Sequence, residues 1–256
     1  MIDTHTHLND KVYSECQNQV LLDAKANGIN HIIDVGWNLL SSEKSACFAS
    51  ENTGVSFLAG VHPSDCESVD NGVIDRLFEL LKHEKAVGMG EIGLDYHYGK
   101  DNKEQQKKAF DTQISMANKA GLPFVVHSRE ASKDMADILT AKRSEINHEF
   151  LMHCYSESIE MAKIYLDLGA NFAFGGAITF KNAKKEEIIR YIPKDRLFCE
   201  TDCPYMAPVP LRGTVNNPSN VKYVYQKMAE ILNLDLQEFI HQVQNNVKRL
   251  FFKIKL

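Results

Sequence analysis

The sequence predicts a closed parallel barrel of strand–helix repeats, the (β/α)8 TIM barrel of the α/β class, as a single domain over residues 1–256. Two observations predict this fold class. Apolar runs of strand length alternate with segments of helical spacing along the chain. Histidine, glutamate and aspartate recur where those runs end, which is where such a barrel carries its catalytic groups.

The apolar runs have the length of buried strands. They lie at about 1–7, 31–36, 55–62, 86–91, 123–128, 150–154, 171–175 and 197–202. A doubly wound open sheet is the alternative, but it would gather its ligands at one crevice, whereas here they follow runs spread along the chain. The closed barrel is therefore the expected architecture.

Segments between the runs repeat apolar residues at helical spacing, and several end at a glycine, as a helix C-cap would. The clearest are 14–28, 72–84, 103–121, 132–146 and 158–169. Two further helical segments, 221–233 and 235–251, close the chain. Before them lies 203–220, which is rich in Pro, Gly and Asn and is expected to arch over the barrel mouth.

Composition limits the classes of partner. The chain has 256 residues, 44% of them hydrophobic, and a net charge of -5, so any nucleic-acid contact should be local and not a broad basic surface. We find no secretory segment, no apolar run of membrane-spanning length and no CxxC pair among the six cysteines. We expect a cytoplasmic protein with reduced thiols, no membrane contact and no obligate protein partner.

His5 and His7 stand two residues apart in the first run, so a strand directs both imidazoles to one face. Similar residues follow at later run ends: His62, Glu91, His127, His153 and Asp202. Taken singly, each is more often a hydrogen-bonded structural residue than a ligand. Burying them together without a cation would cost several kcal/mol per unpaired charge, which favours a metal site.

The candidate metal ligands exceed the number that one tetrahedral ion accepts. They are His5, His7, Glu91, His127, His153 and Asp202. Two divalent ions about 3.5 to 4 Å apart, bridged by Glu91, fit the set better. One ion would take the first two histidines and Asp202, and the other would take His127 and His153. Zn, Mn and Mg all accept such ligands, and the several imidazoles favour Zn or Mn.

This arrangement predicts hydrolysis by a metal-activated water, with Asp202 as the proton acceptor and Glu91 as the second catalytic carboxylate. His62 and Arg129 lie past the third and fifth runs, where they could bind a phosphate oxygen of the substrate. The alternative for Arg129 is a salt bridge with Glu130 or another rim acid. The site is thus expected to combine metal ligands with two substrate contacts.

Four neighbours of the proposed ligands have roles that the sequence leaves open or assigns to packing. Glu200 and Asp95 could each orient a metal-binding residue by contacting it on the side away from the ion, or could be acids at the barrel rim with no role. Cys154 and Cys203 adjoin proposed ligands and are interpreted as small packing residues without chemistry.

A series of short motifs runs from one end of the chain to the other. The stretches IDTHTHL, GVHP, GEIGLDYH, PFVVHSREA, GAITFKNA and ETDCPYMAP occur in this order. In order and spacing they resemble the TatD family of metal-dependent deoxyribonucleases, within the wider amidohydrolase-like barrels. The resemblance implies two divalent ions and phosphodiester hydrolysis. Carried over by position, the family's metal ligands fall on the same six residues.

Two places depart from the family's pattern. Tyr155, Ser156 and Glu157 stand where the family usually has an aromatic residue, a hydroxyl residue and a glycine. Asn217 stands where an acidic residue is expected before Pro218. Both places lie in loops that would contact the substrate, and neither alters the ligand set.

The resemblance implies a deoxyribonuclease, exonuclease-like, acting on DNA or another phosphodiester. The alternative is an ester or amide hydrolase of the amidohydrolase kind, such as a D-aminoacyl-tRNA deacylase, because the same metal cage can act on a carbonyl. Such barrels often bridge their ions with a carboxylated lysine on the fourth strand, where this chain has Glu91, which favours the nuclease. A non-catalytic binding module would show a broken ligand set or a basic patch, and the sequence shows neither.

Overall fold

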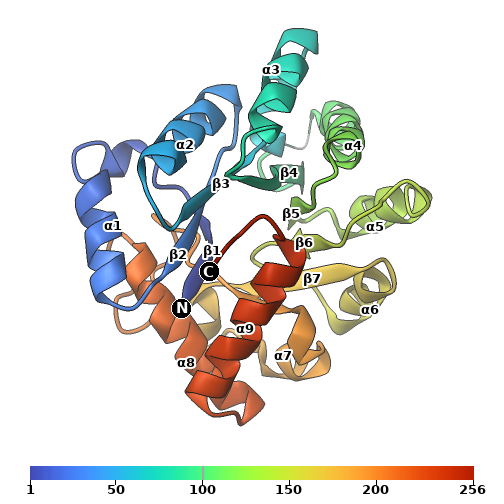
Figure 1. Ribbon diagram of the computed structural model, residues 1–256. Helices are drawn as coiled ribbons and strands as arrows, with labels where there is room; N and C mark the ends of the chain where they lie inside the picture. Colours follow the sequence, from blue (N-terminus) through green and yellow to red (C-terminus); the bar gives the residue numbers. More distant parts are fainter. Residues whose placement is uncertain (100) are drawn as a thin grey trace.

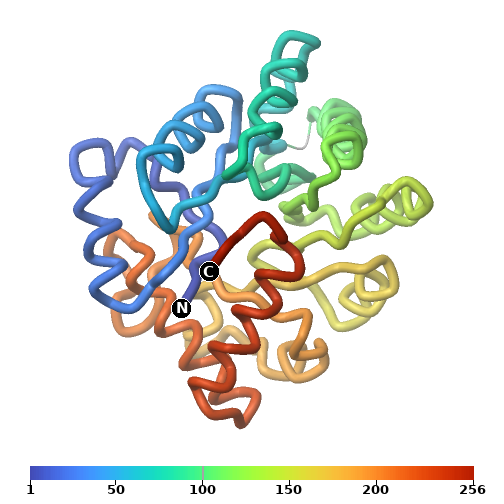
Figure 2. The backbone as a smooth tube through the Cα atoms, in the orientation of Figure 1, coloured from blue at the N-terminus to red at the C-terminus, as the bar shows by residue number. Residues whose placement is uncertain are grey.

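The computed structural model describes residues 1–99 and 101–256. Within them, an eight-stranded parallel sheet runs in the order β1 to β8, so the chain passes once around a barrel (Figure 1; Figure 2). Helices surround the strands on the outside (Figure 1). The (β/α)8 prediction is confirmed, and the open doubly wound sheet is excluded because each strand pairs with its neighbour in sequence.

Each predicted apolar run coincides with one strand. The strands are β1 Ile2–Thr6, β2 His31–Val35, β3 Val55–Ala59, β4 Ala86–Asp95, β5 Phe124–Arg129, β6 Phe150–Met152, β7 Ala170–Phe174 and β8 Leu197–Cys199. The predicted ends differ in two places that matter for the site. Strand β4 continues past Glu91 to Asp95, and β8 stops at Cys199, so Asp202 lies in the segment that follows it.

The barrel closes between β1 and the segment that follows β8. The amide of Asp202 donates to the carbonyl of His5 at 3.0 Å, and the amide of His7 donates to the carbonyl of Cys203 at 2.8 Å. Thr6 and Cys203 form an isolated parallel bridge. These bonds join the end of β1 to the segment after β8 and place Asp202 beside the histidines there.

The helices follow the strands as the alternating pattern predicts. They are α1 Gln17–Ala26, α2 Leu39–Glu51, α3 Asn71–Leu81, α4 Lys103–Ala120, α5 Ser132–Ala141, α6 Ile159–Asp167, α7 Glu186–Tyr191, α8 Val221–Leu232 and α9 Leu236–Leu250. Gly121 ends α4 in the left-handed region with a φ of 65°, as a C-cap glycine does. In the described part of the chain, no helix has the length and apolar character needed to cross a membrane.

The sequence of helix α2 gives only a weak helix signal, because it is rich in serine, which is a poor helix former. Its start is held by a capping box, in which Asn38 and Ser41 each accept the other's backbone amide with a side-chain oxygen. Farther along, the buried Ser45 hydroxyl accepts a hydrogen bond from the side chain of Asn9 at 2.6 Å. Contacts with the rest of the barrel therefore support a helix of weak intrinsic propensity.

Buried aromatic side chains hold the strands in place. Phe124 of β5 and Phe150 of β6 stack with ring centroids 5.0 Å apart. The buried hydroxyl of Tyr225 in α8 donates to the carbonyl of Ile2 at 2.9 Å and accepts its amide at 3.2 Å. Each fully buried side chain of this size contributes about 2 to 3 kcal/mol. This packing holds the amino-terminal ends of β1, β5 and β6 in place.

The segment after β8, which we expected from the sequence to arch over the barrel mouth, lies against the carboxyl ends of β1 and β7. The ring of Tyr205 is 6.3 Å from that of His7, centroid to centroid. The amide of Val209 donates to the hydroxyl of Thr179 at 2.8 Å, which ties the segment to the short 3-10 helix η3 (Gly176–Thr179) after β7. The segment therefore borders the mouth next to β1, β7 and β8.

Candidate metal centre

His5 lies in β1 and His7 directly follows it, and both imidazoles face the same carboxylates. The carbonyl of Val35, at the end of β2, lies 3.0 Å from His7 Nδ1, which directs the other ring nitrogen toward the mouth. His7 Nε2 is 3.5 Å from Asp202 Oδ1 and 3.8 Å from Glu91 Oε2. His5 Nε2 is 3.5 Å from the same Glu91 oxygen. The two-residue spacing therefore directs both imidazoles to one face, beside Glu91.

Glu91 lies between two groups of histidines. Its Oε2 atom faces His5 and His7, as described above. Its Oε1 atom is 2.7 Å from His127 Nδ1 and 3.4 Å from His153 Nε2. Glu91 belongs to β4 and His127 to β5, whereas His153 directly follows β6. Strands from several parts of the barrel therefore deliver their ligands to one carboxylate.

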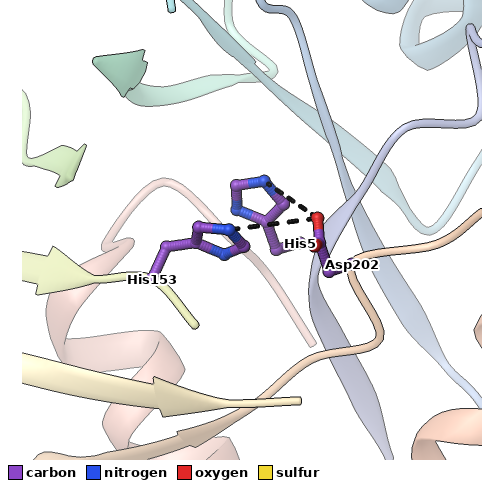
Figure 3. Close-up of side chains that lie close together, drawn as sticks. All are labelled: His5, His153 and Asp202. Atoms are coloured by element: carbon purple, nitrogen blue, oxygen red, sulfur yellow. Dashed lines mark ion pairs between the residues drawn. The ribbon is translucent and has the colours of Figure 1, made fainter. Parts of the chain in front are cut away.

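Asp202 faces the histidines from the closing edge of the barrel. Its Oδ1 atom lies 4.0 Å from His5 Nε2 and 3.9 Å from His153 Nε2 (Figure 3). The rings of these two histidines stack with centroids 3.7 Å apart. The prediction grouped Asp202 with His5 and His7, and the structure places it close to His153 as well.

The side chains fit divalent cations. Both ring nitrogens of His5 are buried and have no hydrogen-bond partner among the described residues. A buried imidazole without partners is costly unless a cation takes its lone pair. Two ligand atoms about 2.1 Å from one tetrahedral ion lie about 3.4 Å apart. The separations of 3.4, 3.5 and 3.8 Å between Glu91 and its more distant histidines are close to that value.

Ligand atoms come together in groups of three that are compact enough for one ion. Those built from the predicted ligands are His5–His7–Glu91, Glu91–His127–His153 and His5–His153–Asp202. The first two share Glu91, which matches a carboxylate common to two halves of a site. His62, Asp95 and His127 form a further group, which the sequence did not suggest.

Two acids whose roles the sequence left open each contact a candidate ligand. Glu200 Oε1 is 2.9 Å from His153 Nδ1, and the same oxygen accepts the amide of Cys154 at 2.7 Å. Asp95 Oδ2 is 3.1 Å from His127 Nε2. A carboxylate on the far nitrogen of a histidine fixes the ring and raises its basicity as a ligand. Both acids are buried, so they are not rim residues.

The carboxylates and imidazoles shift one another's pKa values. Burial would raise the pKa of Glu91, but His153 and His127 outweigh it and hold that pKa well below its ordinary range. Burial would lower the pKa of His153, but Glu200 and Glu91 raise it to about 10. Burial lowers the pKa of His5, with His153 acting in the same direction. A cation that binds here must therefore displace a proton from His153.

His62 lies beyond β3, at the edge of this cluster. Its Nδ1 atom accepts the amide of Ser64 at 3.1 Å. Burial lowers the pKa of His62 to about 4, so the ring is neutral and the proton is assigned to Nε2. The ring packs edge-on against that of His127 with centroids 4.4 Å apart. This geometry leaves His62 with a neutral N–H group next to a candidate ligand.

Arg129 ends β5 at the exposed rim. Its guanidinium carbon lies 4.9 Å from the centroid of the Tyr98 ring. Glu130, the alternative partner suggested by the sequence, contacts His97 at 2.6 Å. Within residues 1–99 and 101–256, Arg129 forms no salt bridge. Stacking on Tyr98 leaves the N–H groups in the plane of the guanidinium free to bind oxygen.

Two aromatic residues beside His7 were not identified from the sequence. The ring of Trp37, which follows β2, is 5.4 Å from that of His7, and Tyr205 approaches the same ring from the segment after β8. Both stand just past the end of an apolar run, as the ligands do. Aromatic rings at such places carry no metal-binding atom, so spacing alone does not single them out.

The family model and the most similar relatives indicate the same kind of protein. Residues 2–252 match the family model described as TatD related DNase. The chain is 38% identical over 252 residues to the uncharacterized metal-dependent hydrolase YabD of Bacillus subtilis, with 98% of each chain covered. It is 33% identical over 255 residues to the uncharacterized metal-dependent hydrolase YcfH of Escherichia coli, with 98% of this chain and 95% of the relative covered.

Solved structures share the barrel. The crystal structure of YjjV, a TatD homolog from Escherichia coli, superimposes with a TM-score of 0.93 at 27% sequence identity and covers 98% of each chain. That of a TatD family hydrolase from Entamoeba histolytica has a TM-score of 0.88 at 24% identity, with 99% of this chain and 98% of the other covered, and shows the fold alone.

Proposed function

The chain belongs to the TatD-related DNase family and is a metal-dependent hydrolase, and from that premise we propose that it cleaves phosphodiester bonds in DNA. The proposed cleavage is exonuclease-like and uses two divalent ions, Zn, Mn or Mg. The proposed metal ligands are His5, His7, Glu91, His127, His153 and Asp202. The proposed catalytic pair is Asp202 and Glu91.

The observation that carries this proposal is the position of Glu91. Each of its oxygens faces a different pair of histidines, an arrangement that supports one carboxylate shared by two neighbouring cation sites. Paired ions of this kind stabilise both the attacking and the leaving oxygen when a phosphate ester is displaced in line. A phosphodiester is therefore the substrate class that the arrangement supports best.

When bound, the divalent ions would lower the pKa of a water molecule toward 7 and neutralise the charge on the phosphoryl oxygens. Asp202 would accept the proton of the attacking water. Burial alone would raise the pKa of Asp202, but the nearby histidines, His7 foremost, lower it, so its carboxylate is ionised. Its side chain is 13% exposed, against 5% for Glu91, which suits a group that meets incoming substrate.

His62 and Arg129 would position the substrate. The neutral N–H group of His62 can donate to a non-bridging phosphate oxygen next to the metal centre. The guanidinium of Arg129 can bind a phosphate oxygen through two of its donors, because its stacking on Tyr98 does not use them. These two side chains border the cluster from the loops after β3 and at the end of β5.

A cytoplasmic location is part of the proposal. The chain has six free cysteines among the described residues, and two of them, Cys16 and Cys47, are exposed. Exposed thiols stay reduced in a reducing compartment. Fractionation of cells that express the tagged protein tests this location.

Product analysis tests the proposed activity. Metal-replete protein is incubated with labelled single- and double-stranded DNA, with RNA, with a small chromogenic phosphodiester and with an aminoacyl ester of tRNA. We expect DNA and the small diester to be hydrolysed. We expect Asp202→Asn to lower kcat by about 10² or more, because it removes the proton acceptor. The matched control is Asp195→Asn, an exposed acid just before β8.

Three outcomes would contradict the proposal. Cleavage of the aminoacyl ester with DNA left intact would identify a carbonyl hydrolase, the alternative that the same cage allows. Normal turnover by Asp202→Asn would refute the role given to that carboxylate. Tight binding of DNA without product, whichever metal is added, would favour a non-catalytic binding module instead.

A further inference from the structure

A groove lined by lysines lies between helix α8 and the segment that joins β7 to α7. Its cavity has a volume of about 140 Å³, and its lining includes Phe180, Lys181, Lys184, Lys185 and Lys227. We refer to this feature as the lysine groove. No basic patch was evident in the sequence, because Glu186 and Glu187 directly follow Lys185.

The lysine groove is attached to two loops that carry parts of the proposed site. On one side, Lys185 Nζ donates to the carbonyl of Ser156, which lies in the loop that begins with His153. On the other side, Thr179 accepts the amide of Val209 at 2.8 Å, and Val209 belongs to the segment after β8. These two bonds connect the groove to the loop that begins with His153 and to the segment that carries Asp202.

The positive charge of the groove is only partly compensated. Lys227 lies 3.2 Å from Glu230 and 4.0 Å from Glu186, so its charge is balanced. Lys181 and Lys184 are exposed and form no ion pair within the part of the chain that the structure describes. A local excess of positive charge therefore stands on a protein whose net charge is -5.

Arg212 adds an oriented guanidinium at the edge of the groove. Its guanidinium carbon lies 4.5 Å from the centroid of the Phe180 ring, which itself lines the cavity. A guanidinium stacked on a ring loses mobility but keeps its in-plane donors. Phosphate oxygens are the acceptors that match such a fork of donors.

We propose that the lysine groove and Arg212 bind backbone phosphates of a polynucleotide that flank the phosphate being cleaved. This inference rests on the proposed function and adds to it a second binding site. Lysine and arginine contacts to phosphate act on any base sequence, so the groove supplies affinity and position but no sequence preference. A small phosphodiester lacks flanking phosphates, so the groove selects polymers over small diesters.

The test compares two substrates in one double variant. The double variant Lys181→Gln with Lys184→Gln removes the two unpaired charges. We expect its kcat/KM to fall for a labelled single-stranded oligonucleotide and for a small chromogenic diester by different factors. The factor for the oligonucleotide should be about tenfold larger. The slope of log KM against log salt should fall by about 1.4, since each phosphate contact contributes about 0.7 for a single strand. The matched control is Lys44→Gln with Lys163→Gln, two exposed lysines on α2 and α6.

Equal losses with both substrates, or no loss with either, would overturn the proposal. Arg212→Lys keeps the positive charge but removes the guanidinium that stacks on Phe180. We expect this substitution to weaken oligonucleotide cleavage more than cleavage of the small diester. A separate binding assay uses fluorescence anisotropy with a labelled phosphorothioate oligonucleotide. If wild-type protein hydrolyses neither substrate, the proposed function fails, whereas weaker binding by the double variant than by its control would still support the groove.

Discussion

The Nδ1 atom of His153 lies 2.9 Å from Oε1 of Glu200, and the opposite nitrogen of the same ring faces Glu91 at 3.4 Å. Glu200 is fully buried and comes from the segment that begins where β8 ends. Glu200 therefore forms an ion pair with a candidate ligand on the ring nitrogen opposite Glu91, and its charge raises the pKa of that ring.

Replacing Glu200 by glutamine should weaken metal binding by about 10- to 100-fold. The side-chain amide of glutamine can still accept the backbone N–H of Cys154, but the substitution removes the negative charge that polarises His153. Titration of metal-free protein with Zn or Mn, followed by calorimetry, measures the affinity. Glu187→Gln, an exposed position on α7, is the control. Unchanged affinity in the Glu200 variant would show that His153 does not depend on this contact.

Glu91→Gln should lower both the metal content and the rate of hydrolysis, the latter by about 10² or more, because it removes the carboxylate whose two oxygens each face a different pair of histidines. Metal content is measured by atomic emission on the purified protein and the rate with a chromogenic phosphodiester. The control is Glu84→Gln, which is exposed and precedes β4. A variant with full metal content and full activity would remove Glu91 from the site.

His31 should make folding stability depend on pH. It is 7% exposed, and burial together with the charge of Lys85 lowers its pKa to about 4 from an ordinary 6.5. Between those values the unfolded chain binds a proton that the folded protein excludes, so stability is present above pH 6.5 and is lost as the pH falls toward 4. From pH 7 to pH 5 this group should lower the free energy of unfolding by about 2 kcal/mol.

Urea unfolding of wild type and His31→Gln at the two pH values isolates that contribution. All other titrating groups are common to both proteins, so the wild type should lose about 2 kcal/mol more than the variant. The side-chain amide of glutamine can replace the ring in its contact with the hydroxyl of Ser56, which lies 2.9 Å from His31 Nε2. Equal losses in the two proteins would mean that His31 keeps an ordinary pKa when folded.

Tyr225→Phe should destabilise the fold by about 1 to 3 kcal/mol and leave catalysis intact. The lost hydroxyl is the partner of both the amide and the carbonyl of Ile2, and both groups are buried at the start of β1. Denaturant unfolding measures the change. Tyr191→Phe, at a position 43% exposed, is the control and should change stability by less than about 0.5 kcal/mol.

Much of this site could be predicted because its chemistry follows strand ends. His5 and His7 share a face through their spacing alone, and Glu91 and His127 were picked out as polar residues at the end of apolar runs. Helix α2 shows the opposite case, because its serines are stabilised by partners such as Asn9 that local propensity does not register.

The sequence by itself determined the order of strands and helices, the barrel class and the kinds of ligand, because hydrophobic periodicity and donor chemistry are local properties of the chain. Only the tertiary structure decided which atoms meet. Closure of the barrel brings Asp202 to His5, the carbonyl of Val35 orients His7, and Glu200 forms an ion pair with His153. Such contacts join residues far apart in sequence, so their geometry depends on the packing of the whole barrel and on no local pattern.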